Sequence, residues 1–246
     1  MMRYLITVEY DGSAYAGWQS QKNAVAVQDV LNAALSDLFS EDVKTEGSGR
    51  TDSGVSALGQ TAHFDAEKFI DPEKIPFAVN TRLPDDIRVL KAVTVSDDFH
   101  ARYSVKKKTY VYRFYVSRIL SPTRRRTHTQ LVPPIDFDAM KRATADLIGT
   151  HDFVGFSSTG SHITNTVRTL SYANLEQNGD EITLTVTGDG FLYNMVRIIA
   201  GTLAFIGKGK LPPTAIKDTL ATKNRKSAGK TYPPEGLCLL KVEYEN

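Results

Sequence analysis

Apolar and polar residues recur along this chain with two different periods, which predicts a mixture of strands and helices throughout. Alternation with a period of two, typical of a strand with one buried face, runs through residues 4–10 and 87–95. Between them, apolar residues from Val27 to Leu38 recur every three or four positions, which predicts a helix with one buried stripe. Shorter elements complete this half: strands near 43–46 and 60–65 and a helix near 72–81. The pattern is typical of a β-α-β-β unit that ends near Ser104.

The second half of the chain mixes the two periods in the same way. Residues 169–177 and 181–188 flank Asn178-Gly179, a dipeptide suited to the positive φ angles of a type I′ turn, so they predict a hairpin. The other predicted elements are a strand at 109–117, helices at 137–148, 191–206 and 212–220, and a last strand at 237–244. We therefore expect two α+β domains, at residues 1–104 and 105–246.

The composition is that of an ordinary globular protein. Of 246 residues, 41% are hydrophobic and 24% are charged, which suffices for one large or two small cores. No stretch approaches the ~18 apolar residues of a membrane span, and the start of the chain lacks the apolar run of a signal peptide, so we expect a soluble cytoplasmic protein. The single cysteine, Cys238, excludes an intrachain disulfide and is expected to be buried. The five histidines lack the short paired spacings of a metal site, so no metal is expected.

Charge is distributed unevenly along the chain. Residues 101–130 contain nine Lys or Arg and no acid, and residues 197–232 contain eight against Asp218 alone, whereas the whole chain carries only +2. Five aromatic residues lie within the first of these segments: Tyr103, Tyr110, Tyr112, Phe114 and Tyr115. Cations bind phosphates and aromatic rings stack on bases, so this combination indicates a nucleic-acid partner.

The residues most suggestive of chemistry lie in a glycine-rich loop at 47–60, where Asp52 closely follows Arg50. Glycines at 47, 49 and 54 permit backbone conformations and a close approach of ligand that a Cβ would prevent. A polar turn without chemistry has the same local composition. A second candidate is Arg197, which lies away from the apolar stripe of its predicted helix; an arginine in so apolar a helix requires an anion or a path to solvent.

The loop resembles the signature Arg-Thr-Asp-x-Gly-Val of the TruA family of tRNA pseudouridine synthases, here residues 50–55. Other segments resemble the family in the same order along nearly the whole chain. They are residues 10–21, 27–28, 80–87, 99–104, 108–112, 151–153, 190–197 with 201–203, and 233–237. The resemblance implies the pseudouridine synthase fold: two ferredoxin-like or RRM-like α+β halves, joined through a continuous, mainly antiparallel sheet.

The resemblance also implies roles for individual residues. Asp52 would be the nucleophile, or the base that starts a glycal route, and Arg197 would pair with it and keep it ionised. Attack at C1′, attack at C6 and the glycal route all stay open. Tyr110 would stack on the target uracil. The remaining contacts would be Arg50, Tyr112 and Leu237 to the substrate, and Lys106, Lys107, Lys108, Arg124, Arg125 and Arg126 to the RNA backbone.

The activity implied by the resemblance is conversion of uridine to pseudouridine in the anticodon stem-loop of tRNA, at positions 38, 39 and 40. The enzyme would flip the base, act as a homodimer and need no cofactor. Two departures leave a different RNA site open: Ser56 stands where the family commonly has His, and residues 121–128 are more basic than the family's segment. An RNA-binding or RNA-chaperone protein without catalysis is the other alternative, because the basic and aromatic segments alone support it equally well.

Overall fold

The computed structural model describes residues 1–158 and 164–245, and the chain folds into two compact units. Unit 1 comprises Met1–Lys106 together with the C-terminal residues from Leu239, and unit 2 comprises Lys107–Cys238. The last strand groups with unit 1, where the Tyr244 hydroxyl donates to the carbonyl oxygen of Ala101 (2.8 Å) and hydrogen bonds with Thr61 Oγ1 (2.6 Å). The sequence-based domains instead place this strand in the second half, and their boundaries stay a prediction.

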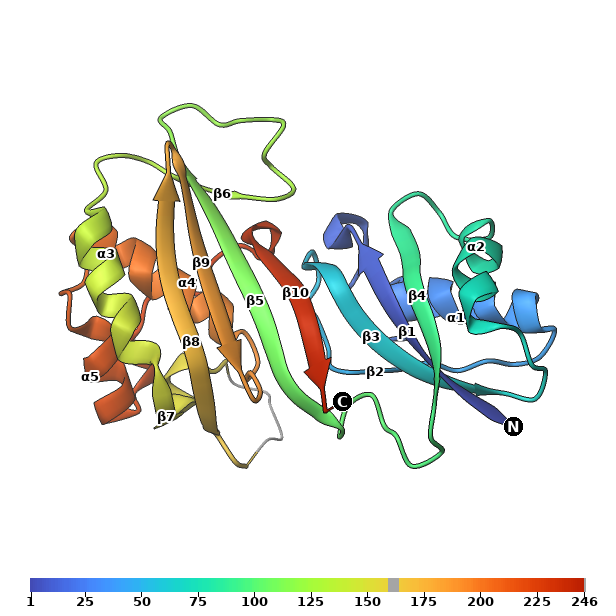
Figure 1. Ribbon diagram of the computed structural model, residues 1–246. Helices are drawn as coiled ribbons and strands as arrows, with labels where there is room; N and C mark the ends of the chain where they lie inside the picture. The colour runs from blue at the N-terminus through green and yellow to red at the C-terminus, as the bar shows by residue number, and fades with distance from the viewer. Residues whose placement is uncertain (159–163, 246) are drawn as a thin grey trace. The chain divides into compact units, whose positions relative to one another are not determined.

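Unit 1 contains strands in the order β4-β1-β3-β10, with β2 beside β3, and helices cover one face of them (Figure 1). Strand β1 pairs antiparallel with β3 and with β4, and β2 pairs antiparallel with β3. The strands are β1 (Met2–Tyr10), β2 (Glu46–Gly47), β3 (Ser56–Ala66), β4 (Ile87–Val95) and β10 (Leu237–Tyr244), and the helices are α1 (Val27–Phe39) and α2 (Ile75–Asn80). The alternation along β1 buries Tyr4, whose ring centre lies 5.7 Å from that of Phe39 in α1 and 5.3 Å from that of Phe64 in β3. These three rings join the helix layer to the sheet.

The strand predicted near 43–46 is mostly absent, because side chains of α1 bind its backbone. Ser36 Oγ accepts a hydrogen bond from the Val43 N–H (2.9 Å), and Asn32 Oδ1 accepts one from the Thr45 N–H (2.9 Å). Pairing with β3 therefore begins only at Glu46.

The strands of unit 2 lie in the order β5-β9-β8-β7 and pair antiparallel, apart from β6, a short strand parallel to β5. Three helices cover one face of these strands (Figure 1). The strands are β5 (Val105–Val116), β6 (Thr129–Leu131), β7 (Gly149–Asp152), β8 (Val167–Asn178) and β9 (Glu181–Gly188), and the helices are α3 (Phe137–Thr144), α4 (Met195–Gly207) and α5 (Ala215–Thr222). Both units are thus mixed α+β with mainly antiparallel sheets, as predicted; the joining of the two sheets stays a prediction.

The hairpin of unit 2 differs from its prediction in the turn. Asn178 still belongs to β8 and pairs with Glu181, so the loop residues are Gly179 and Asp180 rather than Asn178 and Gly179. Gly179 has a φ of +60°, as the first loop residue of a type II′ turn requires. The dipeptide therefore marks the hairpin but not the turn type.

Helix α4 begins four residues later than predicted. Asn194 precedes it with a φ of +60°, a left-handed conformation that a helix interior does not accommodate. Gly190 and Tyr193 also lie before the helix, so they do not share a helical face with Arg197. The helix itself is buried nearly all round, as a helix in the middle of a core should be.

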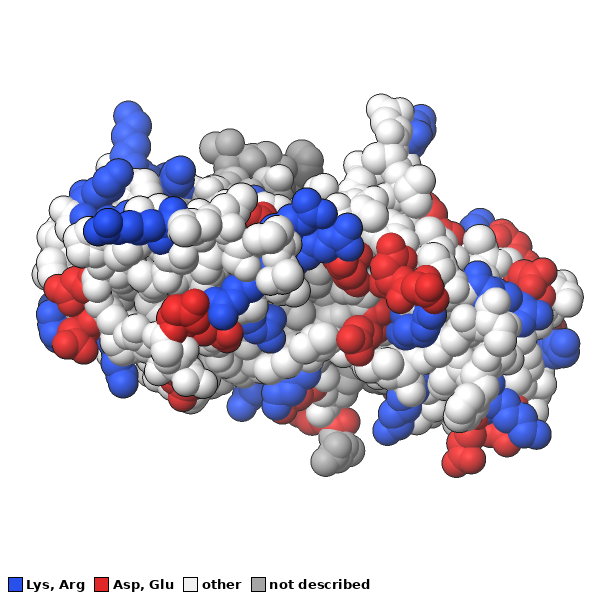
Figure 2. Space-filling view, turned by 90° about the horizontal axis from the view of Figure 1, so that it is seen from above, with Lys and Arg blue, Asp and Glu red and all other residues white. Residues whose placement is uncertain are grey.

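Two surface properties bear on the expectations from composition. Among the described residues, no helix combines the length and the apolar character that crossing a membrane requires. On the face shown in Figure 2, Lys and Arg side chains gather in several patches with Asp and Glu side chains beside them. The basic segments of the sequence therefore do not produce one uniformly basic surface on that face.

Candidate active site

Hydrogen bonds join the base of the loop that carries Asp52 to β3. Ser48 donates its N–H to the carbonyl oxygen of Thr61 (2.8 Å) and its hydroxyl to Gln60 Oε1 (2.6 Å). The other end of the Gln60 amide donates to the carbonyl oxygen of Gly49 (2.9 Å). Ser48 and Gln60 are both fully buried, so these bonds are shielded from water and fix where the loop leaves the sheet.

The tip of the loop is held by the opening segment of the chain, residues 11–18. Trp18 donates its N–H to the carbonyl oxygen of Thr51 (3.2 Å), and the Gly54 N–H donates to the carbonyl oxygen of Tyr15 (3.3 Å). From the end of β1, the Tyr10 hydroxyl reaches Thr51 Oγ1 at 2.8 Å. The two segments whose residues resemble the family most clearly therefore bind each other on both sides of Asp52.

The glycines of these segments mostly serve this packing. A Cβ on Gly17, which has a φ of +91°, would lie 2.4 Å from the carbonyl oxygen of Thr51, and one on Gly47 would lie 2.3 Å from Trp18 Nε1. Gly54 also has a positive φ, of 80°. From the sequence we expected a ligand to lie close to Gly47. In the structure the indole of Trp18 lies there instead.

Asp52 is half-buried between a buried Thr51 and an exposed Ser53, and its own carbonyl oxygen accepts the Val55 N–H (3.1 Å) in a tight turn. Arg50 is exposed, and its Nε donates to Gln19 Oε1 at 3.4 Å. The backbone around the carboxylate is thus fixed while the carboxylate side of the loop remains partly open to solvent.

Ser56 has a definite structural role at the position where the family commonly has His. Its hydroxyl accepts a hydrogen bond from the Gly12 N–H (3.1 Å), and a Cβ on Gly12 would meet the Val55 carbonyl oxygen at 2.0 Å. The serine therefore helps to bind the opening segment against the loop, four residues after Asp52.

Arg197 lies in unit 2, in the first turn of α4, and its guanidinium is fixed by neutral acceptors. Nε donates to the carbonyl oxygen of Tyr232 (2.8 Å), and Nη1 donates to Asn194 Oδ1 (2.8 Å). The amide of Asn194 in turn donates to Ser158 Oγ (3.0 Å), and the Tyr232 N–H returns to the carbonyl oxygen of Arg197 (3.1 Å). These bonds set the direction of the guanidinium and leave its positive charge intact.

Tyr110 and Tyr112 lie two residues apart on β5 but in different surroundings. Tyr110 is 8% exposed and makes an edge contact with Phe191, with 4.9 Å between ring centres. Tyr112 is fully buried; its hydroxyl lies 2.7 Å from Thr129 Oγ1 and donates to the carbonyl oxygen of Pro233 (2.8 Å). Burial, the largest cause, raises the pKa of the Tyr112 phenol above its ordinary value. Tyr112 thus helps to hold the backbone at Pro233 in place. Contact of Tyr112 with substrate stays a prediction.

Leu237 is the first residue of β10 and directly follows that supported segment. It is 6% exposed. A Cβ on Gly236, its neighbour, would lie 2.6 Å from the Tyr112 ring, so the chain turns into β10 in direct contact with this tyrosine. The position of Leu237 therefore depends on Tyr112.

A family model described as tRNA pseudouridine synthase matches residues 6–104 and 143–245 of this chain. The tRNA pseudouridine synthase A of Thermoanaerobacter sp. (strain X514) is 47% identical over 99% of this chain and 100% of its own length. The proteins of the same name from Acetivibrio thermocellus and Bacillus licheniformis are each 43% identical, over 99% and 100% of this chain and over their full lengths.

This chain belongs to the tRNA pseudouridine synthase family. The family resemblance seen in the sequence motifs is thereby confirmed. A solved chain from a Cbf5-Nop10-Gar1 complex matches with a TM-score of 0.40 and 12% identity, covering 83% of this chain and 44% of that chain, and this likeness is too weak to carry an argument.

The cations that the family resemblance assigns to the RNA backbone differ in how they are held. Lys106 and Lys107 are exposed and Lys108 is half-buried, and Lys106 Nζ pairs with Glu245 Oε1 at 2.6 Å. In the loop before β6, Arg124 pairs with Asp180 (2.8 Å) and lies 5.5 Å from the centre of the Tyr115 ring, whereas Arg125 and Arg126 are exposed. Arg124 therefore supports the loop, and its exposed neighbours are better placed to meet phosphates.

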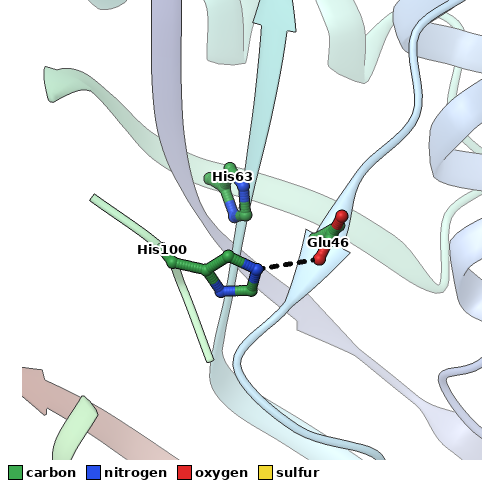
Figure 3. Close-up of side chains that lie close together, drawn as sticks. All are labelled: Glu46, His63 and His100. Carbon is green, nitrogen blue, oxygen red and sulfur yellow. Dashed lines mark ion pairs between the residues drawn. The ribbon is translucent and has the colours of Figure 1, made fainter. Parts of the chain in front are cut away.

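One cluster in this family member was missed by sequence reasoning, because its members are far apart along the chain. Ligand atoms of Glu46, His63 and His100 lie within 4.8 Å of one another, a spacing that suits a metal ion (Figure 3). A neutral imidazole that binds a metal carries its hydrogen on the other nitrogen. Here Nδ1 of His63 accepts the Ala101 N–H (3.2 Å) and Nδ1 of His100 accepts the Arg102 N–H (3.1 Å).

In its neutral form each ring of this cluster carries its hydrogen on Nε2, because Nδ1 already accepts a backbone N–H. Neither neutral ring then offers a lone pair that is not already used. His100 directs that Nε2–H to Glu46 Oε2, at 3.0 Å. Burial is the main cause that lowers the pKa of His63 and so favours its neutral form. These contacts make the cluster a hydrogen-bonded support for the backbone at residues 101 and 102. Of the other three histidines, His162 lies outside the described residues.

Proposed function

We propose that this chain isomerises uridine to pseudouridine in tRNA, with Asp52 as the nucleophile. The observation that carries the proposal is the identity of 41–47% to tRNA pseudouridine synthases A along essentially the whole chain, combined with a loop that holds Asp52 in a fixed backbone. A protein that only bound RNA would need neither the carboxylate nor the buried bonds that position it.

The reaction breaks the N-glycosidic bond, rotates the base and joins it again through carbon 5. A proton leaves carbon 5 and N1 gains one, so the product has the same composition as uridine; no electrons are exchanged, and no redox cofactor is required. An ionised carboxylate supplies the activation by adding to C1′ or to C6, or by removing a proton to start a glycal route. In this proposal Asp52 does so from its half-exposed position in the loop.

Arg197 is proposed to pair with Asp52. A guanidinium beside a carboxylate favours the ionised form and fixes its orientation. The bonds from Arg197 to Tyr232 and Asn194 support this role, because they fix the direction of the guanidinium.

Tyr110 is proposed to lie against the flipped uracil, with Leu237 beside it and Arg50 on a nearby phosphate or sugar. Extruding a base costs a few kcal/mol, which stacking and phosphate contacts offset. Lys106, Lys107, Lys108 and Arg124 to Arg126 are proposed to supply the phosphate contacts. Exposure of Arg50, Lys106, Lys107, Arg125 and Arg126 supports this part of the proposal.

The target proposed is the anticodon stem-loop, at positions 38, 39 and 40, and the enzyme is proposed to act as a cytoplasmic homodimer. Mapping pseudouridine in total tRNA from a strain without this protein tests the target: loss at 38–40, restored by the wild-type chain and not by Asp52→Asn, is expected. Loss at another site with 38–40 unchanged would replace this target by the second candidate, which the exposed Arg125 and Arg126 favour. Light scattering of the purified chain, with and without tRNA, tests the dimer.

A further inference from the structure

A ladder of three rings leads from the interior of unit 1 to its surface. His63, in β3, is 5% exposed, and its ring centre lies 4.7 Å from that of His100. The ring centre of Tyr103 lies 4.3 Å from that of His100, with 39° between the planes, and Tyr103 is 77% exposed. The outermost ring thus presents most of its surface to solvent while a second ring supports it from behind.

The middle ring of this ladder is fixed at both nitrogens. His100 Nδ1 accepts the Arg102 N–H, and Nε2 lies 3.0 Å from Glu46 Oε2 (Figure 3). The segment around it is also tied down, because the Ser104 N–H donates to the carbonyl oxygen of His100 (2.9 Å). An exposed side chain normally loses rotamer freedom when it binds a partner. Because Tyr103 stacks on a fixed ring, its rotamer freedom is already restricted before a partner binds.

Positive charge accompanies the exposed ring. The guanidinium carbon of Arg102 lies 5.8 Å from the centre of the Tyr103 ring, and Arg102 is exposed. Lys106 and Lys107 follow within four residues, although Lys106 also pairs with Glu245. An aromatic face beside an exposed guanidinium matches a nucleotide, whose base stacks while its phosphate binds the cation.

We propose that Tyr103 is a stacking site for an unpaired base of the tRNA substrate, with Arg102 as its phosphate contact and His100 as the ring that supports it. This inference rests on the proposed function, because it takes tRNA as the partner. The base can be any of the four, since each has a π-face that an aromatic ring accepts.

The stacked base belongs to a nucleotide other than the target uridine. His63, at the inner end of the ladder, is six residues along β3 from Ala57, which corresponds to about 20 Å in a strand. The loop with Asp52 joins β3 at the Ser56 end. The stacking site therefore strengthens binding and does not take part in breaking the glycosidic bond.

Binding and single-turnover measurements on purified variants test this site. Tyr103→Ala should raise the Kd for tRNA by roughly fivefold to a hundredfold, which is the range that one stacked base contributes. Tyr103→Trp should bind at least as tightly as the wild type, and the single-turnover rate at saturating tRNA should stay unchanged in both. Phe77→Ala is the matched control, because Phe77 is also an exposed aromatic of unit 1, at 80% exposure, and should bind like the wild type. Wild-type affinity in Tyr103→Ala, or equal weakening in Tyr103→Ala and Tyr103→Trp, would overturn the proposal.

A second measurement identifies the nucleotide. In tRNA with a single abasic nucleotide placed in turn at each unpaired position, one position should weaken binding to the wild type but not to Tyr103→Ala. Absence of such coupling at every position would overturn the stacking site even if isomerisation proceeds normally. Conversely, coupling at one position in a protein whose Asp52→Asn variant still isomerises uridine would leave this site standing and defeat the proposed role of Asp52.

Discussion

The hydroxyl of Tyr10 lies 2.8 Å from that of Thr51, within the protein interior, and so joins the end of β1 to the residue before the proposed nucleophile. Tyr10→Phe removes this bond and leaves the Thr51 hydroxyl with one partner fewer, which should cost about 1–3 kcal/mol of unfolding free energy. Because the loop that carries Asp52 loses an anchor, kcat should fall while the KM for tRNA stays near the wild-type value.

Tyr4→Phe is the matched control for Tyr10→Phe. The Tyr4 hydroxyl donates to the carbonyl oxygen of Ile70 (3.0 Å) and accepts the Ile70 N–H (3.0 Å), in the same unit but outside the loop. It should lose a similar amount of stability in a denaturant titration and keep its kcat. An equal loss of kcat in both variants would show that the effect on turnover comes from general destabilisation.

Gly17 and Gly209 both have positive φ angles, of 91° and 64°, but different surroundings. A Cβ at Gly17 would meet the Thr51 carbonyl oxygen at 2.4 Å, whereas a Cβ at Gly209 would have nothing within 4 Å. Gly209→Ala should therefore lose only the conformational cost of about 1–2 kcal/mol. Gly17→Ala should lose more and should also lower kcat, because the clash displaces the backbone next to Asp52. Equal stability and equal kcat in the two variants would contradict this account of the loop.

Local pattern explains which elements could be predicted. The strands at 87–95 and 237–244 have the predicted bounds, because alternation and flanking turn residues define both ends. The start of α4 could not be predicted, since the left-handed conformation of Asn194 depends on its tertiary contacts, including the bond to Ser158. For the same reason the strand near 43–46 was wrong: α1 side chains bind that backbone, and no periodicity in the sequence reveals this.

The candidate site divides in a similar way. Asp52 and the opening segment could be found from motifs, and the structure adds that the two bind each other. Sequence spacing could not reveal that Ser48 and Gln60 bind the base of the loop to β3. It also could not reveal the contact between the rings of His63 and His100. In both cases the residues that come together are distant along the chain. The register of the sheet brings such distant residues together; for example, Glu46 in β2 pairs with His63 in β3.

The buried His63 should make stability depend on pH. Burial is the main cause that lowers its pKa below the ordinary value of 6.5. Between the folded-state pKa and 6.5 the unfolded chain binds more protons, so the unfolding free energy should fall as pH drops through that window, by at most about 1.4 kcal/mol per pH unit from this group. His63→Asn, which keeps an acceptor for the Ala101 N–H but does not titrate, should lose less stability between pH 7.5 and 5.5. Identical pH profiles of wild type and variant would exclude this role.

Arg125 should contribute to tRNA affinity through phosphate contact. It is exposed, and Arg125→Gln should weaken binding and lower the slope of log Kd against log salt concentration by about 1. Arg88→Gln removes the same charge from unit 1, where Arg88 pairs with Asp85, and should leave the slope unchanged. Equal slopes for wild type and Arg125→Gln would remove Arg125 from the RNA-binding residues.

The central claim is that the carboxylate of Asp52 drives the isomerisation, and tritium release from tRNA labelled at carbon 5 of uridine measures it most directly. Each rearranged base gives up its carbon 5 hydrogen, so release counts completed reactions. Asp52→Asn keeps the shape of the side chain and removes its charge. We expect steady release with the wild type and none above background with Asp52→Asn, at matched tRNA occupancy; release by the variant at the wild-type rate, or no release by the wild type, would contradict the account.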